Sequence, residues 1–426
     1  MRKSGERLAI DGGAPLNTEP FPTTMLGPAL IGEEEAQAVA EVIRSKKLFR
    51  FLDREHSWCA ELENRFKAMT GCAHALAVGG GTASLICGLV GIGVGEGDEV
   101  ILPGYTYIAS ASAVLTCGAV PVIADIDASL TLDPNDIERN ITKRTKAIMP
   151  VHMRGSACDM DRIMAIAKKH GLKVVEDVAQ ACGGSYKGRR LGSFGDCNAF
   201  SLQYHKIITA GEGGIVLTND HILYDRARAY HDTAACWRPD LPRYEGEVFP
   251  GVNFRMSELH GAVALAQLRK LDKLVAGMRA KKKRIKDQIT GIPGITFRKL
   301  NDEAGDTAIC LIFFLKDGET TERFAKALSA EGVGAHCIYS EGVPDWHIYP
   351  HWKMIMGKVT ATPEGCPYTC HYYTEKGGKA EYSPDMCPKT LGYLGRTIHL
   401  NIPPQMTDED CDLTAKAIRK VARALL

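Results

Sequence analysis

Short apolar runs of strand length alternate with helical segments along much of this chain. The run His74–Val78, for example, is followed by a helical pattern around Leu85–Leu89. Further runs of the same kind are Glu99–Leu102, Val120–Ala124, Ala147–Val151, Lys173–Glu176 and Ala199–Leu202. This alternation predicts an α/β fold with a mostly parallel sheet covered by helices on both faces. Ligands of such sheets bind beyond the carboxyl ends of the strands, so functional residues should directly follow strands.

A long helical pattern begins near Ser257 and should lead from one domain into another. With 426 residues, the chain is longer than one ordinary core accommodates, so we expect two domains in contact. We predict an N-terminal arm and a large domain over residues 1–275, and a small C-terminal domain over residues 276–426. Helical spacing after the arm predicts a helix over Glu33–Ser45, and an apolar run predicts a strand in the small domain at Ala308–Leu315.

The balance of charge argues against two classes of partner. Lys+Arg number 52 and Asp+Glu 51, so the net charge of +1 does not favour a general grip on nucleic acid. The basic cluster Arg279–Arg284 is interpreted as the solvated face of a helix. Two uncharged runs, Ala75–Gly95 and Val100–Ala124, are interrupted by Gly and Pro, which favours buried strands and short helices over membrane spans.

The first residues, MRKSGERLAIDGG, lack the apolar stretch of an export signal. We therefore expect a soluble, cytoplasmic protein. The 14 cysteines are scattered along the chain, and in a reducing compartment most of them should be small buried side chains with free thiols.

Two motifs that follow predicted strands suggest the groups of a ligand site. In AVGGGTAS, residues 77–84, a strand enters a Gly-rich turn and then a helix, where backbone N–H groups could bind a phosphate. In VVEDVAQA, residues 174–181, Asp177 ends a buried run, where a carboxylate needs a partner. A cationic ring nitrogen, a helix N-terminus or a buried arginine would each be a suitable partner.

A third motif supplies a lysine. In AFSLQYHKIITAGEGGIVLTND, residues 199–220, Lys206 follows a strand and Ser201 lies five positions before it. A lysine in a dry, apolar site has a lowered pKa and can form a Schiff base with an aldehyde. A phosphate-binding turn, a carboxylate for a ring nitrogen and such a lysine are the groups that hold pyridoxal phosphate.

The sequence resembles the DegT/DnrJ/StrS family of pyridoxal-phosphate-dependent sugar aminotransferases, which have the fold-type-I aminotransferase architecture. The resemblance runs from the arm LAIDGGAPLNTEPFP to TIHLNIP near the end of the chain. The motifs GGGTAS, LPGYTY, EDVAQA, FSLQYHK, GEGG and GVNFR occur in the family's order. The resemblance implies that Lys206 is the Schiff-base lysine, that Asp177 pairs with the pyridine nitrogen, and that Gln180 lies near the cofactor hydroxyl.

The resemblance also implies how the rest of the cofactor is held. Gly81 and Thr82 match the phosphate-binding turn, and Ser201 matches a second phosphate ligand. Tyr107 matches the aromatic residue stacked on the ring. Asn253, in GVNFR, matches a residue that reaches the cofactor phosphate of a partner subunit. Shared sites of this kind imply at least a homodimer.

The implied reaction is a ping-pong transamination. Glutamate or glutamine would give its amino group to the cofactor, Lys206 would move the proton, and a keto or aldehyde group of a sugar or cyclitol would then accept the amine. Some members of the family have histidine in place of the lysine and dehydrate keto sugars; the lysine here favours transamination. A dehydratase, epimerase or lyase on the same fold, and a cofactor-binding regulator, remain the alternatives.

Other residues have open roles. His205 precedes the lysine, but neighbouring side chains on a strand point to opposite faces, which argues against a catalytic role. Arg154 and Arg50 are candidates for binding a donor carboxylate, although surface arginines are common. The segment Asp345–Cys387 is rich in Cys, His and aromatic residues. A zinc site there would lack a second Cys pair, so we predict no metal and expect Trp346 or Trp352 to stack on the acceptor.

Overall fold

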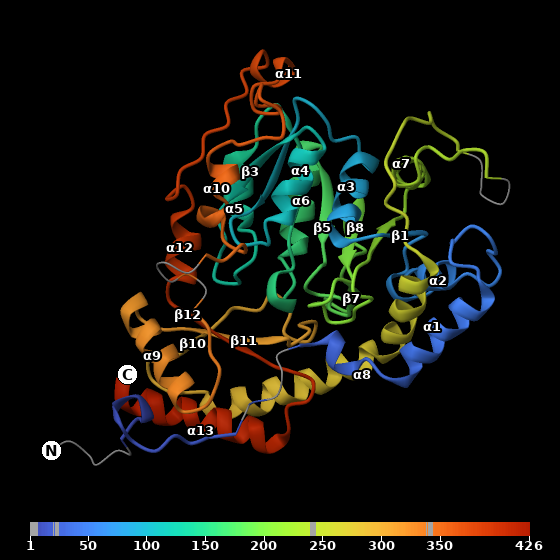
Figure 1. Cartoon of the computed structure of the whole chain (residues 1–426). Helices are drawn as coiled ribbons and strands as arrows, with labels where there is room; N and C mark the ends of the chain where they lie inside the picture. The colour runs from blue at the N-terminus through green and yellow to red at the C-terminus, as the bar shows by residue number, and fades with distance from the viewer. Residues whose placement is uncertain (1–6, 20, 22–24, 239–243, 338, 340–343) are drawn as a thin grey trace.

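A seven-stranded sheet lies at the centre of the structure, a computed structural model that describes residues 7–19, 21, 25–238, 244–337, 339 and 344–426 (Figure 1). The strand order is β1-β9-β8-β5-β4-β2-β3. β9 runs antiparallel to both of its neighbours, and all other pairs are parallel. The predicted α/β fold with a mostly parallel sheet is confirmed. The strands are β1 His74–Val78, β2 Glu99–Pro103, β3 Val120–Ala124, β4 Thr145–Ile148, β5 Lys173–Asp177, β8 Cys197–Ser201 and β9 Gly214–Thr218.

Both faces of this sheet are apolar because both are covered. In β2, Val100 and Leu102 pack in one buried cluster with α3 (Gly81–Gly91) and α4 (Ala109–Thr116). Ile101 belongs to the cluster that contains α2 (Trp58–Thr70), α6 (Met160–His170) and α8 (Glu258–Ile289). Alternating side chains of a strand point to opposite faces, so a strand buried on both faces reads as a continuous apolar run. The helices before the long α8 are α1 Glu33–Ser45, α2 Trp58–Thr70, α3 Gly81–Gly91, α4 Ala109–Thr116, α5 Pro134–Asn140, α6 Met160–His170 and α7 His221–His231.

Helix α8, Glu258–Ile289, extends from beneath the large sheet to a second, three-stranded antiparallel sheet (Figure 1). The division predicted at residues 275 and 276 falls inside this helix and stays a prediction. Within the basic cluster, Arg284 pairs with Asp408 and Asp412 of α13. The elements of this part are β10 Thr296–Phe297, β11 Cys310–Phe314, β12 Thr397–Asn401, α9 Gly318–Ala330 and α13 Asp408–Leu425.

Short elements complete the chain. The N-terminal arm lies on α9 and α13, since Glu331 accepts hydrogen bonds from the Ala9 and Leu16 amides and pairs with Lys420. A two-stranded ribbon is formed by β6 Ser185–Tyr186 and β7 Arg189–Arg190. The remaining elements are the 3-10 turns η1 Ala9–Asp11, η2 Gly27–Leu30, η3 Met153–Gly155 and η4 Tyr349–His351, and the short helices α10 Lys353–Met356, α11 His371–Thr374 and α12 Pro388–Leu394.

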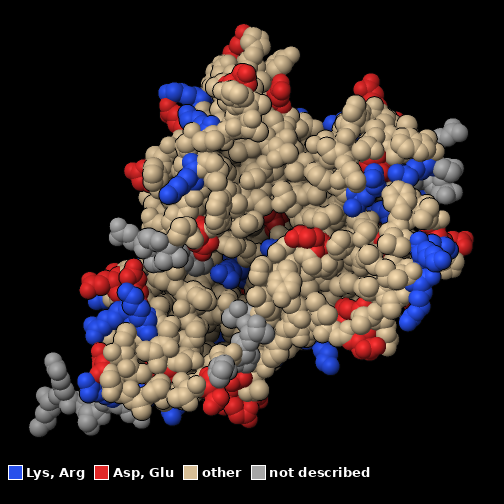
Figure 2. All heavy atoms as spheres, viewed as in Figure 1, with Lys and Arg blue, Asp and Glu red and all other residues tan. Residues whose placement is uncertain are grey.

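The described residues bear on the predictions about cysteines, membrane-spanning helices, metal sites and surface charge. All 14 cysteines are free, and ten of them are buried. Within the described ranges, no helix is both long enough and apolar enough to cross a bilayer. Nor do His, Cys, Asp and Glu side chains gather in groups that could hold a metal ion in the described part of the chain. On the face drawn in Figure 2, basic and acidic side chains intermingle, and neither sign forms a continuous patch.

The segment Asp345–Cys387 covers the β3 edge of the large sheet and does not belong to the C-terminal part. Its aromatic residues are anchored there: the Tyr382 hydroxyl donates to the Pro121 carbonyl at 2.7 Å, and the Tyr373 hydroxyl donates to Glu99 at 3.1 Å. Trp352 has 0% of its surface exposed and packs in the cluster with α3 and α4. The expectation that Trp352 could stack on an acceptor is therefore wrong, whereas Trp346 remains 43% exposed.

Trp352→Ala is expected to destabilise the protein, because it removes a large side chain from a closed core and leaves a cavity. The expected loss is about 3–5 kcal/mol of unfolding free energy. Chemical denaturation followed by far-ultraviolet circular dichroism measures it. Trp346→Ala is the matched control, since the exposed Trp346 should cost far less; equal losses for the two variants would contradict this packing.

Candidate active site

Lys206 lines a cavity of about 340 Å³ beyond the carboxyl ends of the central strands. Residues that line this cavity come from the turn after β4, the loop after β5, the loop after β8 and the C-terminal part of the chain. The described lining residues are Met25, Leu26, Arg154, Ala179, Gln180, His205, Lys206, Ile207, Ile309, His347 and Asn401. The cavity thus lies beyond the carboxyl ends of the strands, the position that the sequence predicted for functional residues.

The backbone of Lys206 is fixed by a turn that follows β8. Its amide donates to the Gln203 carbonyl at 2.9 Å, and its carbonyl accepts from the Gly27 amide at 3.0 Å. Burial lowers the pKa of the Lys206 ammonium, which the nearby Asp177 carboxylate partly opposes. A lower pKa increases the fraction of uncharged amine, the form that attacks an aldehyde.

His205 lies in the same turn and also lines the cavity. The argument that neighbouring side chains point to opposite faces assumes a strand, but β8 ends at Ser201. The reason given against a role for His205 is therefore wrong, although its ring is exposed to solvent.

Asp177 is the last residue of β5 and is 4% exposed. Its carboxylate accepts hydrogen bonds from the Ser110 hydroxyl at 2.9 Å and the Ala179 amide at 3.0 Å. Burial raises the pKa of Asp177, while these hydrogen bonds and the charge of Lys206 act in the opposite direction. Among the described residues it forms no ion pair, so a ligand cation such as a ring nitrogen would compensate its charge.

The glycine turn lies where α3 begins. Gly80 is the N-cap of α3, and the first amides of a helix have no acceptor within the helix. A Cβ on Gly81 would lie 2.6 Å from both Cβ and Oγ of Ser201, so only glycine fits beside that serine. Thr82 is exposed in the first turn. The amides, the positive end of the helix dipole and the Ser201 hydroxyl together could bind a phosphate.

Gln180 and Tyr107 reach the cavity region in different ways. Gln180 lines the cavity and accepts a hydrogen bond from the Arg154 amide at 3.2 Å. The Tyr107 ring, 48% exposed, lies 5.2 Å from the ring of His347, which is itself a lining residue. Tyr107 thus lies at the rim of the cavity, with a ring face that a planar ligand could contact.

Asn253 is not among the residues that line the Lys206 cavity. It is exposed, and the adjoining Phe254 carbonyl accepts from the Gly79 amide at 2.7 Å, so this segment lies beside the glycine turn. Arg50 is also remote from Lys206: it is 6% exposed, pairs with Glu63 at 2.5 Å and donates to the Ala77 carbonyl. Its pairing with Glu63 and its absence from the cavity lining do not favour a donor-binding role for Arg50, which stays a prediction.

The sequence placed the segment Asp345–Cys387 near the acceptor but did not single out His347 or Asn401 as site residues. His347 lines the cavity because its segment pairs with the chain before α4: the Ile108 amide donates to the Trp346 carbonyl at 2.9 Å, and the Tyr349 amide donates to the Gly104 carbonyl at 3.0 Å. Asn401, at the end of β12, also lines it. No local pattern in the sequence marks either contact.

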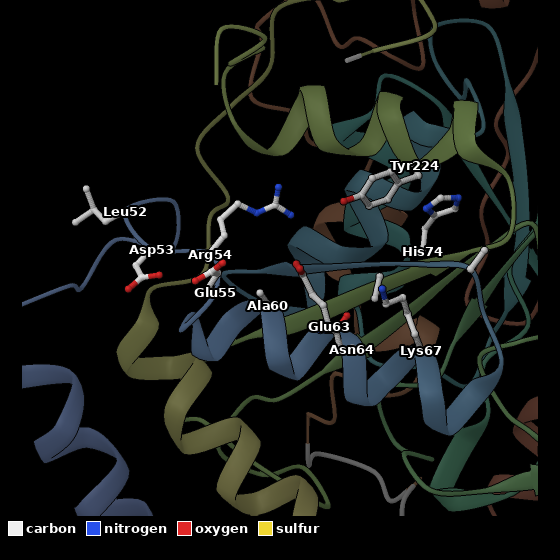
Figure 3. Close-up of a pocket in the computed structure, with 12 residues that line it drawn as sticks. Leu52, Asp53, Arg54, Glu55, Ala60, Glu63, Asn64, Lys67, His74 and Tyr224 are labelled. Carbon is white, nitrogen blue, oxygen red and sulfur yellow. The ribbon is translucent and has the colours of Figure 1, made fainter. Parts of the chain in front are cut away.

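A larger hollow, of about 600 Å³, shares no lining residue with the Lys206 cavity. Figure 3 shows it between α2, which carries Glu63 and Lys67, and α7, which carries Tyr224. Acids and bases lie side by side in it, including Asp53, Arg54, Glu55, Glu63 and Lys67. It offers no combination of a partly desolvated lysine and a buried acid like that near Lys206.

The residues present around Lys206 fit pyridoxal phosphate. The amides at the start of α3 lie beside the Ser201 hydroxyl, Asp177 is a buried acid with no ion pair among the described residues, and Lys206 is an amine of lowered pKa. These are the three groups that the cofactor's phosphate, ring nitrogen and aldehyde require.

Comparison with known proteins agrees with this site. The chain is 33% identical over 408 residues to the spore coat polysaccharide biosynthesis protein SpsC of Bacillus subtilis (strain 168), covering 92% of this chain and 96% of that protein. It is 36% identical over 363 residues to an L-glutamine:2-deoxy-scyllo-inosose aminotransferase of Micromonospora echinospora, covering 80% and 83%.

A similar fold is known from crystal structures. An aminotransferase from Psychrobacter cryohalolentis matches with a TM-score of 0.77 and 28% identity, covering 96% of this chain and 99% of that one. Residues 29–419 match the DegT/DnrJ/EryC1/StrS aminotransferase family. The resemblance noted in the sequence motifs is confirmed, and the chain belongs to the DegT/DnrJ/EryC1/StrS aminotransferase family.

Proposed function

We propose that this protein is a pyridoxal-phosphate-dependent aminotransferase that moves an amino group from glutamate or glutamine to the keto or aldehyde carbon of a sugar or cyclitol. The observation that carries the proposal is that Lys206, which lines the cavity and has a lowered pKa, lies near enough to the buried acid Asp177 for their charges to interact. The named activities of the relatives, on a cyclitol and in polysaccharide synthesis, support this acceptor class.

In this proposal, each predicted residue has a role toward the cofactor. Gly81, Thr82 and Ser201 bind the phosphate, and Asp177 keeps the ring nitrogen protonated. Gln180 lies by the ring hydroxyl and Tyr107 stacks on the ring; the contact of Tyr107 with His347 at the cavity rim supports its placement.

When bound, pyridoxal phosphate supplies an aldehyde that carries the amino group and a conjugated ring that withdraws electrons from the carbon beside the nitrogen. Lys206 then accepts the proton that leaves the donor's α-carbon, since its amine is uncharged more often than that of an exposed lysine. Asp177 would keep the ring nitrogen protonated, and the positively charged ring would favour the negative charge that develops on that carbon.

The proposal extends to a homodimer in which Asn253 reaches the phosphate of the partner subunit, because Asn253 is exposed beside the glycine turn and does not line its own Lys206 cavity. It also extends to a cytoplasmic location, which suits 14 free cysteines.

The half-reactions test this proposal. Adding glutamate or glutamine to purified holoenzyme, without acceptor, should remove the yellow absorbance of the lysine-bound cofactor and release one 2-oxo acid per site. A panel of keto sugars and inososes should then restore the colour, and the acceptor that does so fastest identifies the substrate. If no amino acid changes the spectrum, while a sugar alone is dehydrated, epimerised or cleaved, then the protein is not an aminotransferase.

A further inference from the structure

Arg154 projects into the Lys206 cavity from a strained backbone. Its φ of 52° and ψ of 41° lie in the left-handed region, which residues other than glycine seldom adopt. Contacts on both sides fix this conformation: the Arg154 amide donates to Gln180, and the Gly155 carbonyl accepts from the Thr307 amide at 3.0 Å. Such strain persists only where the surroundings enforce it, and it is concentrated at functional sites.

The guanidinium of Arg154 forms no ion pair with an acid among the described residues, unlike those of the buried Arg50 and Arg228. Arg50 pairs with Glu63, and Arg228 pairs with Asp225 at 3.0 Å. Among the described residues, Arg154 forms no ion pair; its Nη1 donates a long hydrogen bond of 3.4 Å to Asn401 Oδ1, and the Tyr105 side chain also interacts with it. The nearby Asp345 carboxylate is already bonded to His347 at 2.8 Å.

Unsatisfied polar atoms gather around this guanidinium. Among the described residues, the buried Nε of Arg154 and Nδ1 of His399 have no hydrogen-bond partner. Burial raises the pKa of Tyr105 to about 12, and Arg154 beside it opposes that rise. The rings of Tyr105 and His399 lie 6.4 Å apart. A buried charge and buried polar atoms without partners are costly, so the site is built for a ligand that supplies an anion.

We propose that Arg154, together with Asn401, binds the α-carboxylate of the amino-acid donor. The lining of the cavity carries Arg154, Lys206, His205 and His347 but no Asp or Glu among the described residues. A guanidinium presents two parallel donors that match a carboxylate. The α-carboxylate is bonded to the same carbon from which Lys206 removes a proton, so binding it in this cavity positions the reacting carbon. This inference rests on the proposed aminotransferase function.

Asn401→Asp tests the site without removing the arginine. The new carboxylate would occupy the position of the Asn401 amide, 3.4 Å from Nη1 in the wild type, and would compete with the donor. We expect the glutamate concentration for half-maximal colour loss to rise about 10- to 150-fold, which corresponds to the loss of one hydrogen bond to a charged group. The thermal stability of the variant should not fall. Arg154→Gln should give a similar rise. Asn401→Ala removes one proposed contact without adding a charge, so it should give a smaller rise than Asn401→Asp.

A binding measurement on the holoenzyme complements the kinetics. Glutarate, which has carboxylates but no amine to transfer, should raise the melting temperature of the wild type, but not that of Asn401→Asp or Arg154→Gln. Unchanged glutamate dependence in both Asn401→Asp and Arg154→Gln would overturn the assignment, as would a rise confined to the acceptor's KM. A wild-type spectrum that responds to no amino acid would instead refute the proposed function itself.

Discussion

Lys206→Ala is expected to reduce aminotransferase turnover by at least about 10³-fold, because it removes both the amine that holds the aldehyde and the base that moves the proton. The purified variant should also lack the yellow absorbance of a lysine-bound cofactor. Its fold should be retained, since Lys206 is only partly buried and lies in a turn fixed by backbone hydrogen bonds. Single-turnover absorbance with glutamate measures the rate, and circular dichroism checks the fold.

Two additions to this experiment separate chemistry from structure. A small primary amine such as methylamine should restore part of the proton transfer in Lys206→Ala, since the cavity vacated by the side chain can admit it. Lys187→Ala is the control, because the exposed Lys187 pairs with Asp161 far from the cavity lining. A variant that retains the yellow absorbance would show that another lysine holds the cofactor.

The strands and the first helix could be predicted from the sequence because their signals are local. β1, β3 and α1 occupy the predicted ranges, since apolar runs limited by Gly or Pro, or apolar residues at helical spacing, define each one. The direction of β9 could not be predicted in this way. Gly214–Thr218 reads as an apolar strand, but its antiparallel position between β8 and β1 depends on contacts with distant segments.

The same distinction applies to the site. Asp177 ends a strand, and Lys206 and Gly81 follow strands, each in a recognisable motif, so they could be singled out before the fold was known. Asn401 joins them only because the C-terminal sheet packs against the large domain. Trp352 shows the converse error: an aromatic side chain suits a ligand surface and a closed core equally well, and only its 0% exposure decides between them.

Asp177→Asn is expected to have opposite effects on function and on stability. With the cofactor bound, the variant should lose turnover on the order of 10²-fold or more, because the preorganised negative charge opposite the ring nitrogen is gone. Its affinity for the cofactor should also fall. The amide still fits the site: its oxygen can accept from the Ala179 amide, and its nitrogen can donate to the Ser110 hydroxyl. Cofactor titration and half-reaction rates measure these losses.

Without the cofactor, the same variant should melt at a higher temperature than the wild type. Burial raises the pKa of Asp177 in the folded protein above its pKa in the unfolded chain. As the pH rises from the unfolded pKa to the folded pKa, ionisation of Asp177 therefore lowers the stability of the fold. Above the folded pKa the full loss of stability remains. Asparagine does not titrate and avoids this penalty, so the difference in melting temperature should vanish in acid and grow toward neutral pH.

Asp133→Asn provides the matched control for the sign. Asp133 is 2% exposed, and although burial alone would raise its pKa, the hydrogen bond from Lys389 lowers it. Its ionised form therefore stabilises the fold at neutral pH, and Asp133→Asn should lower the melting temperature where Asp177→Asn raises it. Equal melting temperatures for wild type and Asp177→Asn without cofactor would mean that the protein itself already compensates the charge. Asp177 would then not be reserved for a cationic ligand.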